Sequence, residues 1–282
     1  MQKEIKGLEQ WVYFLTQTDI PVMKRTGREL AALREEPDKL GARSVAEVIA
    51  RDPFMTVKLL RYLQSHKRRT QTTELVVVEQ ALLMLGLEVF FNKIPPAPLV
   101  EERMAGHIEA LTHLLHVVRR AHRASNYARE WAVLYLHDMR YEEVRIAALL
   151  HDLAEMLMWC FEPAAMLEIR HRQEQDKALR SRAVQEEVLG FALADLQRAL
   201  AKEWNLPDLL LTLMDDGNQE QTRVRNVVLA VNLARHSANG WDDAALPDDY
   251  SDIGQLIHMQ AAEVMTLLAA DAGTACDLSR PH

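Results

Sequence analysis

Hydrophobic residues recur with the spacing of an α-helix along most of this chain. Near the amino terminus, Ile5, Leu8, Trp11 and Leu15 lie three or four residues apart, which predicts an amphipathic helix over residues 2–18. Alternating patterns typical of strands are hard to find, and only 10 of the 282 residues are glycine. The pattern therefore predicts an all-α fold, built as a bundle of many helices.

Helix start and stop signals divide the rest of the chain. Asp52 and Pro53 fit the N-cap and first positions of a helix that ends near residue 65, and Ser44 begins a capping box for the short helix before it. Further helices are predicted up to about residue 34 and over residues 75–85, 87–94, 184–204, 209–214, 224–237 and 253–270.

A long helix from residue 107, broken once near Asp138, is expected to lead into the most apolar stretch of the chain, Tyr141–Phe161. That stretch is apolar on nearly every face and predicts one helix that is buried on all sides. His151 and Asp152 stand next to each other in its middle. Burying an imidazole and a carboxylate is costly unless each is hydrogen-bonded, charge-paired or bound to a metal. The pair is therefore either part of a divalent-metal site or a polar node that ties neighbouring helices together.

A proline-rich linker at Pro95–Pro98 suggests a boundary between two parts of the chain. We expect an N-terminal helical subdomain over residues 1–98 and a second helical subdomain over residues 99–282. A loop rich in aspartate is expected at residues 241–250, and a disordered tail from residue 273.

Charge and cysteine content exclude some classes of function. The net charge is -8 and the pI is about 5.8, whereas a duplex nucleic-acid binder would carry a basic stripe. The short basic run Lys67–Arg69 is interpreted as a solvated loop. Cys160 and Cys276 form no metal-binding motif, which fits a reduced compartment. With no signal peptide and no apolar run that could span a bilayer, we expect a cytoplasmic protein with no nucleic-acid or membrane partner.

Several short motifs, taken together, resemble one known family. Residues 49–61 read IARDPFMTVKLLR, residues 79–86 read EQALLMLG and residues 148–153 read ALLHDL. In their order and separations over residues 13–240, these motifs resemble the HDOD family of bacterial signalling domains, which are helical relatives of the HD phosphohydrolases. Further similarities lie at Ile20–Pro21, Glu187, Leu189–Phe191 and Trp204–Pro207.

The resemblance implies both a fold and a function. The fold is a smaller N-terminal helical subdomain packed on an HD-like helical bundle. The function is that of a non-catalytic bacterial regulatory module in signal transduction, which acts through protein–protein contacts. Its implied partners are other signalling proteins, among them sensor proteins and proteins that turn over cyclic dinucleotides.

The resemblance also indicates which residues an HD phosphohydrolase would use to bind metal. These are a histidine on an earlier helix, the adjacent His151 and Asp152, and an aspartate on a later helix. His122 is the best match for the earlier histidine, and Asn232 stands where the later aspartate belongs. An amide oxygen is a weaker ligand than a carboxylate. We therefore expect no catalytic residues and no cofactor, and a divalent metal held by these four residues is the alternative.

Other departures from active relatives point the same way. Ala154 replaces the glycine that follows the third motif, and Glu155 stands where many active HD enzymes carry lysine. The additional histidines of two-metal relatives are missing near residues 192 and 214–216, and the turn Asp215–Asn218 is interpreted as solvated. Two rival functions stay open: a metal-dependent phosphohydrolase acting on a nucleotide or phosphoester, and a nucleotide-binding regulator without hydrolysis.

Overall fold

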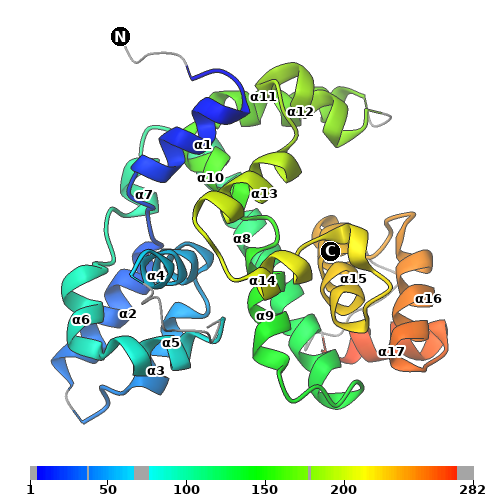
Figure 1. The fold of residues 1–282 in the computed structure, drawn as a ribbon. Helices are drawn as coiled ribbons and strands as arrows, with labels where there is room; N and C mark the ends of the chain where they lie inside the picture. Colours follow the sequence, from blue (N-terminus) through cyan, green and yellow to red (C-terminus); the bar gives the residue numbers. More distant parts are fainter. Residues whose placement is uncertain (1–4, 37, 67–75, 177–178, 272–282) are drawn as a thin grey trace. The chain divides into compact units, whose positions relative to one another are not determined.

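A computed structural model describes residues 5–36, 38–66, 76–176 and 179–271, and its regular structure over these residues is helical throughout, as predicted (Figure 1). The basic run at 67–69 and the tail from 273 lie outside the described residues. The chain divides into two compact units. Unit 1 comprises the residues up to Val118 together with Asp152–Leu211, and unit 2 comprises Arg119–His151 and the residues from Thr212 onward.

The helices of unit 1 come from both halves of the sequence. They are α1 (Leu8–Gln17), α2 (Lys24–Glu35), α3 (Ala42–Ile49), α4 (Pro53–Ser65), α5 (Val78–Leu85), α6 (Leu87–Lys93), α7 (Val100–Arg103), α10 (Leu153–Phe161), α11 (Pro163–Gln175), α12 (Ser181–Leu189) and α13 (Leu193–Glu203). Two helices begin in unit 1 and end in unit 2, namely α8 (Ile108–Leu134) and α14 (Asp208–Leu213).

Unit 2 is built around one buried helix, α15. Its helices are α9 (Tyr141–Leu150), the 3₁₀ turn η1 (Asp216–Asn218), α15 (Thr222–His236), the 3₁₀ turn η2 (Ser237–Asn239), α16 (Leu246–Ile257) and α17 (Ala261–Asp271). Helix α15 packs against α9 and α16, and α17 packs against α16.

Unit 1 contains helices from both sides of residue 98, where the sequence predicted a boundary between subdomains. Helix α1 packs on α13. At that contact, Trp204 Nε1 donates a hydrogen bond of 3.2 Å to Thr16 Oγ1. The Phe14 ring meets the Phe161 ring edge-on, with 5.6 Å between centroids. Residues 152–211 therefore belong with the amino-terminal helices, and contacts between distant segments fix this unit.

Asp52 ties the starts of two helices together in unit 1. It caps α4 as predicted, because its Oδ1 accepts hydrogen bonds from Phe54 N at 2.9 Å and Met55 N at 3.1 Å. Its Oδ2 accepts from Met23 N, the N-cap residue of α2, at 2.9 Å. The predicted N-cap of α3 is wrong. Helix α3 starts at Ala42, so Gly41 is its N-cap, and Ser44 lies in the first turn, where its Oγ accepts from Gly41 N.

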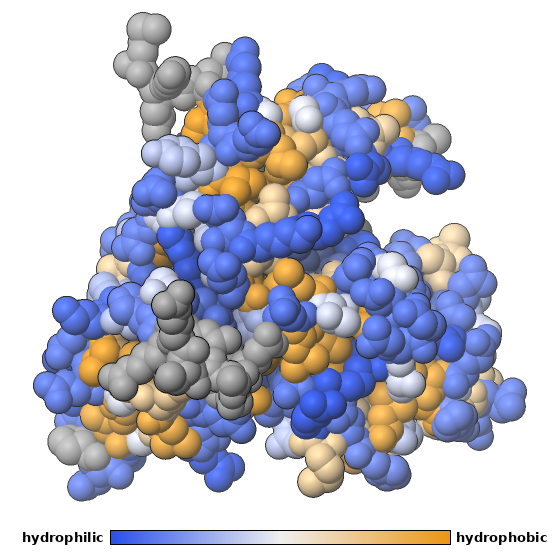
Figure 2. Space-filling model, in the orientation of Figure 1, coloured by the Kyte–Doolittle hydropathy of each residue, from blue (hydrophilic) through white to orange (hydrophobic). Residues whose placement is uncertain are grey.

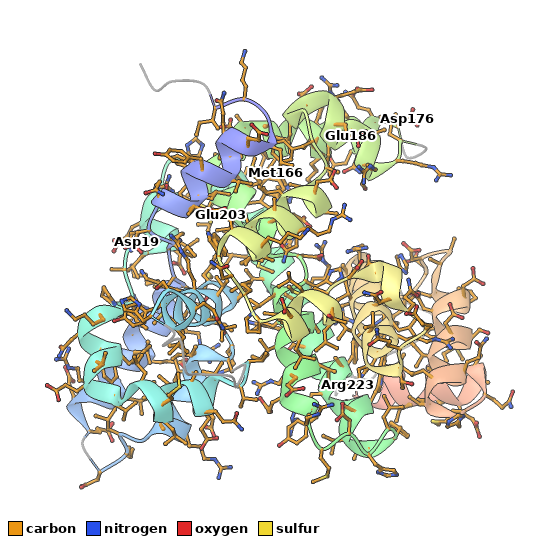
Figure 3. All side chains as sticks on the ribbon, in the orientation of Figure 1. Asp19, Met166, Asp176, Glu186, Glu203 and Arg223 are labelled. Carbon is orange, nitrogen blue, oxygen red and sulfur yellow. The ribbon has the colours of Figure 1, made fainter. Side chains whose placement is uncertain are left out.

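In unit 2, a network of charged side chains joins the start of α15 to the connection between α8 and α9. Arg223, marked in Figure 3, lies 2.8 Å from Asp138 and 2.6 Å from Glu143, measured between nitrogen and carboxylate oxygen. It also donates to the carbonyl of Arg140. The three charged side chains are largely buried. An Arg in this position offers several donors at fixed angles, so one side chain can hold the whole connection.

Two helices predicted as continuous are each split in two. The segment 184–204 divides into α12 and α13 at Gly190, which ends α12 in the left-handed conformation at φ 83°. The segment 253–270 divides into α16 and α17 after His258, which has φ 60°. The chain returns so closely here that a Cβ on Gly254 would lie 2.5 Å from Met259 O. Glycine is therefore required at that position.

Most of the surface in view is hydrophilic, with hydrophobic side chains gathered in patches (Figure 2). One patch lies over α5 and α6, where Leu83, Met84 and Val89 are exposed. Within the described part of the chain, we find no helix with the length and apolar character needed to cross a membrane.

Candidate functional site

The predicted continuous helix over residues 141–161 is wrong, because it breaks at the His151–Asp152 pair. Helix α9 ends at Leu150 and α10 starts at Leu153, with Asp152 at φ -101° and ψ 26°. A new helix start leaves backbone N–H groups without intrahelical partners. Gln197 on α13 satisfies one of them, because its Oε1 accepts from Ala154 N at 2.7 Å. The break thus depends on a side chain that is distant in sequence.

His151 is paired with a carboxylate from a turn 65 residues later in the chain. Its Nε2 lies 2.9 Å from Oδ1 of Asp216 in η1. The His151 side chain is 11% exposed, whereas that of Asp216 is 63% exposed. The turn that carries Asp216 is held by Asp215, whose Oδ1 accepts from Gly217 N at 3.0 Å. The turn is solvent-exposed, as interpreted from the sequence, but the sequence did not indicate that it would pair with His151.

The remaining candidate ligands lie on two other helices of unit 2. His122 is half-buried on α8, and Asn232 is half-buried on α15. Over the residues that the structure describes, no group of three or more His, Cys, Asp or Glu side chains is arranged to hold a metal ion. Asn232 offers a neutral amide oxygen where an HD phosphohydrolase would carry a carboxylate, so that position supplies a weaker metal ligand.

His236, which lies one helical turn after Asn232, is paired with a residue of α16. Its Nδ1 lies 2.6 Å from Asp249 Oδ2, and the Asp249 side chain is buried. Burial raises the pKa of the Asp249 carboxyl, and the hydrogen bond and charge of His236 partly oppose that increase. The pair links α15 to α16, so His236 has a structural partner.

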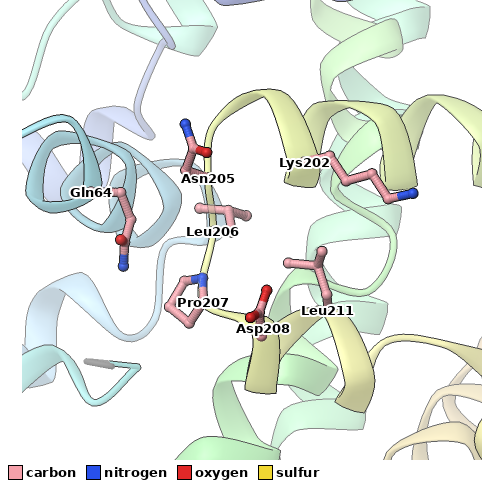
Figure 4. A pocket seen from close by; sticks show the side chains of 7 residues that line it. All are labelled: Gln64, Lys202, Asn205, Leu206, Pro207, Asp208 and Leu211. Carbon is pink, nitrogen blue, oxygen red and sulfur yellow. The ribbon is translucent and has the colours of Figure 1, made fainter. Parts of the chain in front are cut away.

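A second candidate site is a cavity of about 470 Å³ within unit 1 (Figure 4). Its lining comes from the end of α4, the end of α13, the connection that follows and the start of α14. The lining residues are Gln64, Lys202, Asn205, Leu206, Pro207, Asp208 and Leu211. The sequence singled out Trp204–Pro207 as a motif, but nothing in it placed Gln64 opposite that motif.

Comparison with known proteins identifies the family and the fold. The model of the HDOD domain matches residues 20–219, which is more than half of the chain. No curated protein matches the chain in sequence.

Two solved structures illustrate the fold. The MmoQ response regulator of Methylococcus capsulatus is 18% identical and has a TM-score of 0.63, and the match covers 90% of this chain and 99% of that one. A virulence factor of Campylobacter jejuni is 18% identical, with a TM-score of 0.61 over 98% of this chain and 95% of its own. At these identities the likeness concerns the fold alone, and it confirms the all-α prediction.

Proposed function

The chain belongs to the HDOD domain family, and from this premise we propose that it is a signal-transduction protein that acts through contacts with other proteins and not through hydrolysis. The response regulator of Methylococcus capsulatus shares its fold over nearly the whole chain, which supports a signalling role. The choice between a catalytic and a non-catalytic mechanism depends on the residues around His151.

The observation that carries this proposal is the pairing of His151 with Asp216. An ionised carboxylate only accepts hydrogen bonds, so at 2.9 Å the Nε2 atom of His151 carries the proton and donates it. While Nε2 holds this proton it has no lone pair to offer a metal, so a metal could bind this ring only at Nδ1. The pairing engages Nε2 in a contact between the end of α9 and η1, both of which belong to unit 2, and this supports a structural role for His151.

Two other polar residues of unit 2 add to this argument. Asn232 supplies an uncharged amide at the position where an active relative would carry a carboxylate. His236 lies against Asp249 and satisfies a carboxylate that would otherwise be buried alone. The pairings of His151 and His236 thus connect separate elements of unit 2, as expected of a module that transmits a conformational state.

Hydrolysis assays test the proposal directly. The purified chain is incubated with bis-p-nitrophenyl phosphate and with a cyclic dinucleotide, in the presence of Mn²⁺, Fe²⁺ or Ni²⁺. We expect no turnover above that of a folded Asp152→Ala variant. A metal-dependent rate that the Asp152→Ala variant loses would overturn the proposal.

A metal-dependent phosphohydrolase remains the rival function, and the retained neighbours His151 and Asp152 are the observation in its favour. Metal analysis of the protein purified without chelators discriminates between the two. Stoichiometric iron, manganese or nickel, lost together in His122→Ala and Asp152→Ala variants, would favour the rival.

We propose that the partners are signalling proteins of the sensor or cyclic-dinucleotide-turnover classes. In-cell cross-linking of the tagged chain, followed by mass spectrometry, tests this assignment. Recovery of such proteins is the expected result. If only enzymes unrelated to signalling were recovered, the assignment of partner class would be wrong.

A further inference from the structure

The cavity beside the end of α13 has a rigid base that local contacts hold in place. Asn205, at φ 50°, follows α13 in the left-handed conformation, and Leu206 N donates to Ala201 O at 2.9 Å. The neighbouring Trp204 is fixed on both sides. Its indole nitrogen donates to Thr16, and the guanidinium of Arg61 lies 5.2 Å from the ring centroid.

Arg61 is itself anchored, so the base of the cavity does not depend on one contact. Its guanidinium donates to the backbone carbonyl of Thr16 and lies 3.5 Å from that of Thr18. Gln64, one turn further along α4, then faces the cavity from a fixed helix. A site built on anchored elements binds a ligand with little cost of ordering.

Three polar groups at the cavity, those of Gln64, Lys202 and Asn205, are available for a ligand. Among the described residues, neither the Gln64 amide nor the Lys202 ammonium group has a hydrogen bond or ion pair. The Asn205 amide makes only one long contact, 3.5 Å to Glu203 O. Figure 4 shows the two amides on one side and Lys202 on the other, with Leu206 between them. The cavity thus combines hydrogen-bonding amides, one free cation and an apolar base.

This combination fits an extended peptide better than a polyanion. A side-chain amide offers both a donor and an acceptor, which match the C=O and N–H groups of an extended backbone. Leu211 offers apolar contact to a side chain of the peptide, whereas Leu206 is 4% exposed and Pro207 is buried. Lys202 and Asp208 contribute opposite charges, so the lining is neutral overall and does not favour the several charges of a nucleotide phosphate.

We propose that this cavity binds an extended segment of a partner protein in which an apolar residue lies next to an acidic one. The apolar side chain packs on Leu211, the peptide backbone pairs with the amides of Gln64 and Asn205, and the acidic side chain pairs with Lys202. A volume of about 470 Å³ lies in the range of ligand-sized pockets. The proposal rests on the proposed function, since it names how this chain contacts a partner.

A charge reversal at Lys202 tests the proposal, with a control that matches it closely. Lys202 and Lys93 are both exposed and both lie in the last turn of their helices, α13 and α6. Lys202→Glu and Lys93→Glu therefore change charge and helix dipole alike, but only the first alters the cavity. Gln64→Ala serves as a second variant, because it removes one amide and leaves the charge unchanged.

A display library of random heptapeptides is selected on the full-length wild-type chain, and the enriched peptides are measured by fluorescence polarisation. We expect an aromatic or aliphatic residue beside Asp or Glu. We expect affinity to fall at least tenfold in Lys202→Glu, to fall less in Gln64→Ala and to stay within twofold in Lys93→Glu. Selection on Lys202→Glu should enrich basic peptides instead.

Three results would overturn the proposal: no enrichment, enrichment that Lys202→Glu leaves intact, or saturable binding of GMP that depends on Lys202 while no peptide is enriched. The outcome is separable from that of the proposed function. If peptide selection fails while cross-linking in cells still recovers signalling proteins, the site is wrong and the function stands. If the chain hydrolyses phosphodiesters, the function is wrong whatever the peptides show.

Discussion

Asp52 in unit 1 and the His151–Asp216 pair in unit 2 show two uses of polar residues. Asp52 is 1% exposed and accepts from three backbone N–H groups at the starts of α2 and α4. The His151–Asp216 contact joins one side chain that is 11% exposed to another that is 63% exposed. Because solvent can replace the second contact but not the first, Asp52 should determine stability and the pair should contribute little. A polar residue in a family motif can therefore serve the fold alone.

The largest effect should come from truncating the buried carboxylate. Asp52→Ala leaves the N–H groups of Met23, Phe54 and Met55 without their acceptor, and we expect a loss of about 3 kcal/mol in the free energy of unfolding. Urea unfolding followed by circular dichroism measures it. Asp215→Ala removes an exposed cap of η1 and should cost about 0.5 kcal/mol. Equal losses in the two variants would remove the contrast between buried and exposed caps.

In unit 2, the comparable buried contact is that of Arg223. Arg223→Ala leaves Asp138 largely buried without its cation and leaves Glu143 with only the longer contact to Arg140, and we expect a loss of about 2 kcal/mol in the same unfolding experiment. Arg225→Ala is the matched control, because this arginine lies two residues further on and makes exposed contacts with Gln255 and Asp252. If the control lost as much stability, the buried network would not be the cause.

Acidification should change the stability of the wild type relative to that of Asp52→Asn, whose side-chain amide has the same shape as the carboxyl group. Burial raises the pKa of the Asp52 carboxyl, and the bonds from Met23, Thr26, Met55 and Phe54 only partly oppose it. The folded state therefore takes up this proton at a higher pH than the unfolded state.

As the pH falls through the raised pKa, the wild type should gain stability relative to Asp52→Asn, and the gain should be complete below the ordinary carboxyl pKa. Denaturation of both proteins across this pH range measures the difference. A constant difference, or a relative loss in the wild type on acidification, would show that the pKa is not raised.

The smallest effect should come from the exposed pair. We expect a coupling energy below about 1 kcal/mol between His151 and Asp216 in a double-mutant cycle of alanine variants. Thermal or urea unfolding of the two single variants and the double variant gives this coupling. A coupling above that of the Arg223 contacts would place the pair among the structural determinants of unit 2.

Local signals in the sequence predicted much of the fold. The start of α4 was predicted correctly because Asp52 and Pro53 act within one turn of that helix. One break that was missed depends on a distant partner, because Gln197 caps α10 from 43 residues away. Another is local: Met259 approaches Gly254 through a tight turn, and the sequence pattern did not indicate that turn.

The candidate site was predictable only in its residue types. The motifs identified His151 and Asp152 as candidate site residues. The partner Asp216 lies 65 positions from His151, in a turn whose polar composition is ordinary, so the sequence did not indicate the pairing. The cavity was beyond sequence reasoning for the same reason, because Gln64 on α4 and Lys202 on α13 face it from separate parts of the chain. Resemblance to a family can indicate which residues are chemically important. Which side chains lie next to them can be known only from the three-dimensional structure.

The central claim is that Nε2 of His151 donates to Asp216 and that the imidazole does not bind metal. Long-range ¹H–¹⁵N NMR spectra of the histidine rings, recorded during titration with Zn²⁺, test it most directly, with Asp152→Ala and Asp216→Ala as references. We predict a protonated Nε2 in His151 whose resonance moves in Asp216→Ala and is unchanged by equimolar Zn²⁺. Joint shifts of His122 and His151 at one equivalent of Zn²⁺, absent in Asp152→Ala, would contradict the claim.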